Sequence, residues 1–231
     1  MLRGFLSTTC GILLLSTANG LHAGIVTGPA DLDLGGTIVF AGNLRTGNVS
    51  ETVNSVTFTS LPTPGLAGVT ASIPITTNPG GFSGNSPSFG ASSSDDALER
   101  IYASLGYDNA LAGTVSVDAT VLSGSTYKVQ LLFYEPYTSG RRFDVSVEGT
   151  VIFNEFDPYT AQGGTFASAY VYSQTYTATD NTLNILLTSG TTGSNNNPYL
   201  NGFIVTLVPE PSSFALATIG LVGLFGLRRK R

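Results

Sequence analysis

The chain has 231 residues, 11% of them charged, and a formal net charge of −5. This length suits one sandwich- or barrel-sized domain together with processing segments. Residues 24–208 hold five basic and fourteen acidic side chains, a net charge of −9, so no basic surface is expected for nucleic acid. Cys10 and His22 are the single Cys and His, and both precede this region, which therefore lacks disulfides and thiol or imidazole groups for metal binding or catalysis.

Residues 1–23 predict a removable signal peptide. Arg3 gives a positive start, residues 5–15 form an apolar stretch too short to span a bilayer permanently, and Leu21-His22-Ala23 is a plausible cleavage site. Cleavage after Ala18-Asn19-Gly20 is one alternative, and a buried first helix is another. The chain is therefore expected to be exported.

The first half of the domain contains three candidate strands, at residues 37–41, 53–59 and 67–73. Residues 95–102 instead predict a short helix. The acidic start of this segment suits a helix N-terminus, and Leu98, Ile101 and Leu105 share an apolar face.

Later stretches alternate apolar and polar residues with period two, which is typical of half-buried strands. They lie at residues 115–121, 127–133, 143–147, 183–187 and 203–207. Turn residues separate them, and Glu148-Gly149-Thr150 predicts a tight hairpin between residues 143–147 and 151–153. Many short strands joined by turns predict an all-β antiparallel sandwich or barrel with one short helix.

Four segments of the second half resemble a malectin-like domain. They are residues 127–135 (YKVQLLFYE), 142–149 (RFDVSVEG), 156–157 (FD) and 201–205 (NGFIV), so the resemblance covers mainly residues 127–207. It implies a jelly-roll β-sandwich, similar in shape to galactose-binding-like modules. Several members bind glucose disaccharides or other glycans through aromatic and acidic loop residues, so the resemblance also implies a polysaccharide or other glycan as partner.

Sugar binding requires flat aromatic faces and a few fixed polar groups. Two strand-to-loop exits, at residues 134–142 and 154–159, carry both and are expected to share one end of the sandwich. The candidate ligand-binding residues are Tyr134, Tyr137, Arg142, Asp157, Tyr159 and Tyr199. The alternative is that tyrosines pack under their own loops while Arg142 pairs with a local acid.

Two acidic groups raise the questions of metal binding and catalysis. Asp31 and Asp33 are candidate calcium ligands, because a spacing of two on an extended chain places both carboxylates on one face; a solvated edge is the alternative. No other cofactor is expected.

Glu135, Glu155 and Asp157 are the carboxylates that a glycosidase would need, but no sequence pattern places two of them across a cleft. The domain is therefore predicted to be non-catalytic.

Residues 209–231 form a separate C-terminal segment. Pro209-Glu210-Pro211 is followed by an apolar run at 214–227, a predicted transmembrane helix, and by basic residues 228–231, which are expected to stay cytoplasmic. This order resembles the PEP-CTERM sorting signal. The resemblance implies inner-membrane anchoring, processing by an exosortase-type membrane protease, and delivery to the cell surface or the exopolysaccharide matrix. A plain single-span anchor is the alternative.

Two functions fit this organisation. The first is an exported, non-catalytic surface or extracellular-matrix protein that binds carbohydrate. The second is a structural or adhesive matrix protein without a defined ligand site. An exposed aromatic cluster at a loop end favours the first function, whereas tyrosines buried in the core beneath bare Gly/Ser loops favour the second.

Overall fold

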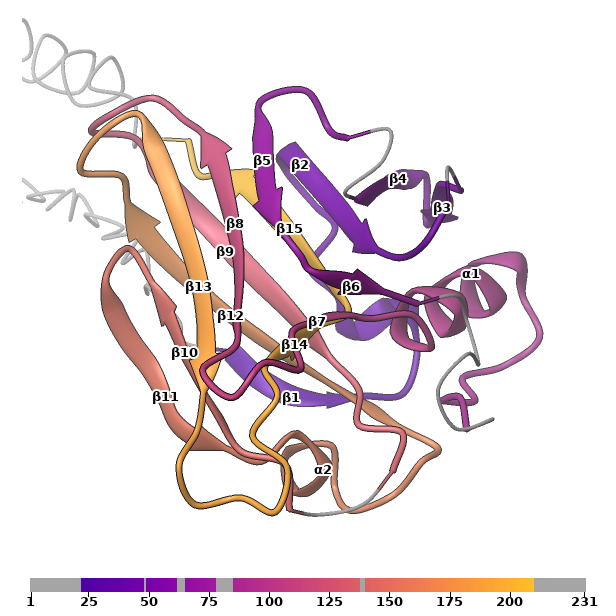
Figure 1. The fold of residues 1–231 in the computed structure, drawn as a ribbon. Helices are drawn as coiled ribbons and strands as arrows, with labels where there is room; N and C mark the ends of the chain where they lie inside the picture. Colours follow the sequence, from indigo (N-terminus) through magenta and orange to yellow (C-terminus); the bar gives the residue numbers. More distant parts are fainter. Residues whose placement is uncertain (1–21, 48, 62–64, 78–84, 138–139, 210–231) are drawn as a thin grey trace, which may run out of the picture.

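Two β-sheets stacked face to face form the body of the protein (Figure 1). The computed structural model describes residues 22–47, 49–61, 65–77, 85–137 and 140–209. The larger sheet has seven strands in the order β1 (His22–Val26), β12 (Ala169–Thr177), β9 (Thr126–Phe133), β15 (Gly202–Leu207), β2 (Thr37–Leu44), β4 (Val56–Leu61) and β3 (Glu51–Val53). The smaller sheet has five, in the order β11 (Thr150–Phe156), β10 (Phe143–Val147), β13 (Thr182–Ser189), β8 (Thr114–Thr120) and β5 (Val69–Ser72).

Three short strands and three short helical segments complete the described part of the fold. A small sheet contains β14 (Tyr199–Leu200), β7 (Gly106–Tyr107) and β6 (Ile75–Thr76). The helical segments are the 3-10 turn η1 (Pro29–Asp31), α1 (Ser93–Tyr102) and α2 (Pro158–Ala161). The all-β prediction is confirmed, and the helix expected at residues 95–102 is α1.

The main core lies between the two large sheets, and the period-two patterns predict its members well. From β8 and β13 the side chains are Val115, Val117, Ala119, Leu183, Ile185 and Leu187; from β9 they are Tyr127, Val129, Leu131 and Phe133. Tyr170 and Tyr172 of β12 also pack there. Since every second residue of a strand points to the same face, these positions meet across the sandwich.

A second core lies on the opposite face of the seven-stranded sheet, under α1. Leu98, Ile101 and Tyr102 of the helix pack against Leu132 and Ile204 of β9 and β15. The inner strands of this sheet are therefore buried on both faces, which explains why β9 ends in an unbroken apolar run.

The start of α1 is fixed by a capping box. Ser92 Oγ accepts a hydrogen bond from the Asp95 backbone N–H, and the Asp95 carboxylate accepts one from the Ser92 backbone N–H. These bonds satisfy two donors that the first helical turn leaves unpaired. They also hold the pKa of Asp95 below its usual value.

The structure corrects three details of the predicted fold. The single strand expected at 53–59 is two strands, because Asn54 and Ser55 adopt positive φ angles of 46° and 71° and form a tight turn between β3 and β4. This second reversal makes β4 run parallel to β2, so the large sheet is not wholly antiparallel. A second α-helix, α2, follows Asp157, which caps it, and Pro158, whose fixed φ suits the first helical position.

The two ends of the chain lie mostly outside the described residues. Most of the predicted signal peptide and, of the tail, Glu210, Pro211 and the expected membrane helix are not described. β1 begins at His22, so its first two residues belong to the segment predicted to be removed. Among the described residues, no helix is long and apolar enough to cross a membrane.

Candidate functional pocket

One end of the sandwich gathers segments that are distant in the sequence. Register brings β14 against β7, with Tyr199 opposite Tyr107. Arg141, in the loop between β9 and β10, forms a β-bridge with Asn195, in the loop after β13. These pairings bring the loop after β9, the loop after β13 and the small sheet together at one place.

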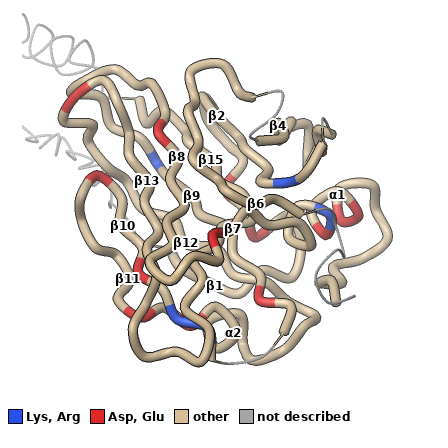
Figure 2. The backbone as a smooth tube through the Cα atoms, in the orientation of Figure 1, with Lys and Arg blue, Asp and Glu red and all other residues tan. Residues whose placement is uncertain are grey.

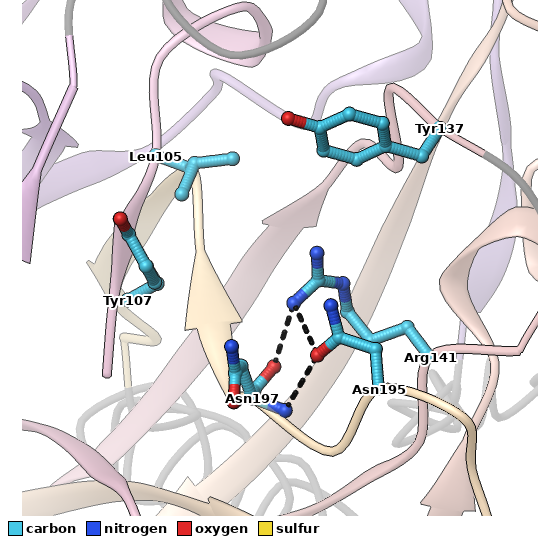
Figure 3. Close-up of a pocket in the computed structure, with 6 residues that line it drawn as sticks. All are labelled: Leu105, Tyr107, Tyr137, Arg141, Asn195 and Asn197. Carbon is cyan, nitrogen blue, oxygen red and sulfur yellow. Dashed lines mark hydrogen bonds between the residues drawn. The ribbon is translucent and has the colours of Figure 1, made fainter. Parts of the chain in front are cut away.

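A pocket of about 250 Å³ opens at this meeting point. Its lining consists of Leu105, Tyr107, Tyr137, Arg141, Asn195 and Asn197. Tyr137 is 37% exposed, among the most exposed large rings of the described chain, and Tyr107 is half-buried. Figure 3 shows the guanidinium of Arg141 between the Tyr137 ring and the two asparagines, with Leu105 and Tyr107 across the pocket. Aromatic rings thus border a polar floor.

Arg141 organises that floor through three hydrogen-bonded partners and one aromatic ring. Its Nε donates to Glu135 Oε2 at 2.6 Å, and its Nη1 donates to Asn195 Oδ1 at 3.2 Å and to the Asn197 carbonyl at 3.1 Å. The guanidinium carbon also lies 5.0 Å from the centre of the Tyr199 ring, within cation–π range. Only 7% of the Arg141 side chain is exposed, so these contacts hold it in one orientation.

Glu135 lies one layer beneath the pocket and is itself 1% exposed. Its Oε1 accepts from the Tyr137 backbone N–H, and its backbone exchanges hydrogen bonds with the buried Gln162 amide. Burial raises the pKa of the Glu135 carboxyl, and the adjacent Arg141 charge opposes that shift. The ion pair therefore fixes both the exit of Tyr137 from β9 and the position of Arg141.

Glu155, at the end of β11, holds the loop that carries Asn195 and Asn197. Its two carboxylate oxygens accept four hydrogen bonds from Thr191 and Thr192, two from hydroxyls and two from backbone N–H groups, at 2.6–3.2 Å. These bonds lower the pKa of Glu155 to about 2. The residue has a φ of 55°, which a side-chain-bearing residue rarely adopts. The Glu155 carboxylate thus holds the loop after β13 in place through these hydrogen bonds.

The tyrosines predicted as ligand-binding residues fall into different environments. Tyr137 lines the pocket. Tyr134 is 1% exposed in the second core, where its hydroxyl donates to the Phe166 carbonyl. Tyr199 is also 1% exposed, and its ring packs edge-on against Phe143 beneath Arg141. Neither buried ring presents a face to solvent.

Arg142 and Asp157 form an ion pair with each other, which is the alternative given above for Arg142. Arg142 Nη1 lies 2.8 Å from Asp157 Oδ2, and Asp157 also caps α2 by accepting from the Thr160 backbone N–H and hydroxyl. Tyr159 is half-buried, with its ring centre 5.5 Å from that of Phe166. Tyr159 lies in α2 and the other two residues lie at its start, and none of the three lines the pocket.

Asp31 and Asp33 border a second hollow, which Lys128 and Gln130 also line. Asp31 accepts hydrogen bonds from the Thr27 backbone N–H and hydroxyl, and Asp33 is ion-paired with Lys128. Their carboxylates thus have protein partners in this structure. Among the described residues, no group of three or more Asp, Glu, His or Cys side chains is placed to hold a metal ion.

Every basic side chain of the region 24–208 is ion-paired. Arg45 and Arg100 share Glu51, Lys128 pairs with Asp33, Arg141 with Glu135, and Arg142 with Asp157. Figure 2 shows these basic positions as few and scattered over the backbone. The described surface therefore has no unpaired basic side chain to attract a polyanion.

Sequence reasoning missed Tyr107, Leu105 and the individual asparagines of the pocket. The run Asn195-Asn196-Asn197-Pro198 marks a loop in the sequence but does not indicate what the loop contacts. Tyr107 lies on a strand of two residues, too short to leave an alternating pattern. The pairing of β7 with β14 decides its position, and that register is not visible in a single sequence.

Two family models match the chain. The Malectin domain model matches residues 88–203, about half of the sequence and most of the described sandwich. The PEP-CTERM protein-sorting motif matches residues 207–230. No curated protein matches the chain.

Solved structures that are similar in fold include ectodomains of plant receptor-like kinases. The ANXUR2 extracellular domain from Arabidopsis thaliana superposes with a TM-score of 0.60 at 12% identity, covering 75% of this chain and 49% of that one. The ANXUR1 extracellular domain, also from Arabidopsis thaliana, gives 0.59 at 13% identity, covering 74% and 49%. The chain thus spans about half the length of the solved structures that it matches, and this likeness concerns the fold.

Proposed function

Because the chain belongs to the malectin-domain family and carries a PEP-CTERM sorting motif, we propose that it is an exported, non-catalytic surface protein that binds carbohydrate. The ligand site in this proposal is the pocket between Tyr107 and Tyr137. The polysaccharide of the cell's own matrix is the expected source of the ligand.

The pocket itself carries this proposal. Tyr137 offers an exposed ring to the C–H-rich face of a sugar, and Arg141, Asn195 and Asn197 offer polar groups to its hydroxyls. The polar groups are held in place before a ligand arrives, because Arg141 is fixed by Glu135 and the asparagine loop by Glu155. A site ordered in advance loses less conformational entropy on binding.

The sorting motif supports the proposed route to the surface. Pro209, Glu210 and Pro211 are the proposed recognition tripeptide of an exosortase-type protease, and the apolar run after them is the proposed membrane helix. The domain would then be held at the inner membrane before processing and released to the surface or the extracellular matrix.

A glycan array and a polysaccharide pull-down, each with calcium and with a chelator, test the binding proposal. We expect saturable binding that Tyr137→Ala abolishes and that Leu122→Ala leaves unchanged, because Leu122 is an exposed apolar residue in the turn between β8 and β9. Tyr159→Ala reports whether the site extends to α2. A folded protein that retains no glycan under either condition would favour the structural or adhesive function.

A further inference from the structure

Resting on the proposed carbohydrate site, we infer that the pocket selects a sugar unit that bears an acyl group, such as an O-acetyl or N-acetyl substituent. The acyl carbonyl oxygen would accept hydrogen bonds from Arg141 and Asn195, and its methyl group would pack against Leu105.

The hydrogen bonds of the floor leave donors facing the pocket. Arg141 Nε and Nη1 are committed to Glu135, Asn195 and Asn197, whereas Nη2 makes no hydrogen bond to another described residue. The Asn195 oxygen accepts from both Arg141 Nη1 and the Asn197 backbone N–H, so its amide nitrogen remains a donor. Asn195 is exposed at the pocket, where a ligand can reach that nitrogen.

The two acceptors that contact the Arg141 guanidinium at the floor are already engaged. Asn195 Oδ1 and the Asn197 carbonyl both accept from Arg141, and none of the six lining residues is an Asp or Glu. A ligand group that only donates hydrogen bonds therefore finds both of these acceptors already bonded beside Arg141. A group that only accepts, such as a carbonyl oxygen, matches the donors Arg141 Nη2 and the Asn195 amide nitrogen.

Local charge favours a neutral acceptor over a carboxylate. Glu135 lies 2.6 Å from Arg141 and balances its charge, and the neighbouring Arg142 is balanced by Asp157. Glu155, close to the same loop, adds a negative charge. An anionic sugar would therefore bring an uncompensated charge into a partly desolvated site, which costs free energy, whereas a carbonyl accepts the same hydrogen bonds without that cost.

The remaining lining suits the rest of such a substituent. Leu105 is 5% exposed and presents an apolar surface beside the rings of Tyr107 and Tyr137. A methyl group placed there is removed from water together with that surface. The volume of about 250 Å³ is below the range of pockets for drug-sized ligands and suits one substituted sugar unit.

Calorimetric titration of the full chain, purified in detergent, tests this inference with four disaccharides. They are chitobiose, which carries N-acetyl groups, 6-O-acetyl cellobiose, unmodified cellobiose, and a β-1,4-linked glucuronate disaccharide. We expect both acetylated sugars to bind about tenfold more tightly than cellobiose, the effect of one well-placed hydrogen bond with its methyl contact. Equal binding of cellobiose, or tighter binding of the glucuronate, would overturn acyl selection while leaving sugar binding intact. Failure of all four to bind would overturn the inference together with the proposed carbohydrate site.

Asn195→Asp locates the selectivity, because it replaces the donating amide nitrogen with an oxygen of the same size. We expect this variant to bind acetylated sugars no more tightly than cellobiose. Asn154→Asp, an exposed position on β11, adds the same charge outside the pocket and is expected to keep the preference. If Asn195→Asp melts at the wild-type temperature and keeps the preference for acetylated sugars, the inference is wrong.

Discussion

The ion pair between Arg141 and Glu135 affects both the stability of the domain and the shape of its pocket. Their side chains are 7% and 1% exposed and lie 2.6 Å apart, so neither charge is hydrated as it would be at the surface. A buried charge needs its partner far more than an exposed one does, because the dielectric around it is low. The pair also holds the Tyr137 backbone and the asparagine loop, so its loss would affect both folding and binding.

Glu135→Ala is expected to lower the free energy of unfolding by about 3–5 kcal/mol, because it leaves the Arg141 guanidinium buried without its counter-charge. Asp33→Asn is the matched control. It breaks the Lys128 pair, in which the Asp33 side chain is 61% exposed, and should cost about 0–1 kcal/mol. Urea unfolding of both variants checks this, and equal losses would contradict the account.

Glu155 predicts an acid-sensitive loop. The pKa of its carboxyl is about 2 in the folded chain against an ordinary 4.5, so its contribution to stability is complete above pH 4.5 and is lost as the pH falls from 4.5 toward 2. The side chain of Glu155→Gln cannot titrate. Its amide nitrogen is a donor that would face the hydroxyl and backbone donors of Thr191 and Thr192, so some of the four hydrogen bonds would be lost. Thermal melts should therefore separate wild type from this variant above pH 4.5 and converge toward pH 2. If the difference in melting temperature stayed constant across that range, Glu155 would not stabilise the loop through its charged carboxylate.

At the scale of elements, alternation of side chains predicts which strands exist but not how they are arranged. The stretches at 115–121 and 183–187 are the strands β8 and β13, because a strand with one buried face keeps period two. Alternation does not reveal the turn at Asn54-Ser55, since a two-residue reversal leaves the apolar pattern on both sides intact. It also does not reveal strand order, and strand order is what forms the pocket.

Helix α1 is expected to be an integral part of the sandwich and not a peripheral cover. Leu98 is wholly buried between the helix and the large sheet, so Leu98→Ala should lower the free energy of unfolding by about 2–5 kcal/mol. Leu111→Ala, at a fully exposed leucine, should change it by less than about 0.5 kcal/mol. Chemical denaturation distinguishes the two, and a small effect of Leu98→Ala would show that α1 contributes little to the core.

At the scale of the whole molecule, the pocket and the end of β15 lie at opposite ends of the sandwich. Tyr199 of β14 lies beneath the pocket. From there β15 runs along β9 in the large sheet and ends at Leu207 (Figure 1). Six strand residues span roughly 20 Å. The pocket and the end of β15 are therefore about one strand length apart.

This separation predicts that sorting and binding are independent. Glu210→Ala should block processing in a host that has an exosortase, leaving the longer chain in the membrane fraction, while the affinity of the purified protein for its glycan stays at the wild-type value. Tyr137→Ala should abolish glycan binding and leave processing of the C-terminus unchanged. Mass spectrometry of the C-terminus and a pull-down measure the two properties, and coupled loss in either variant would contradict the independence of the two ends.

The most direct test of the account is a crystal structure of the protein in complex with an oligosaccharide that it retains in the array. We expect a sugar ring beside Tyr137 and Tyr107, with a polar substituent directed toward Arg141 and Asn195. A sugar bound at another surface, such as the hollow at Asp31 and Asp33 or the side of α2 that carries Tyr159, would contradict it.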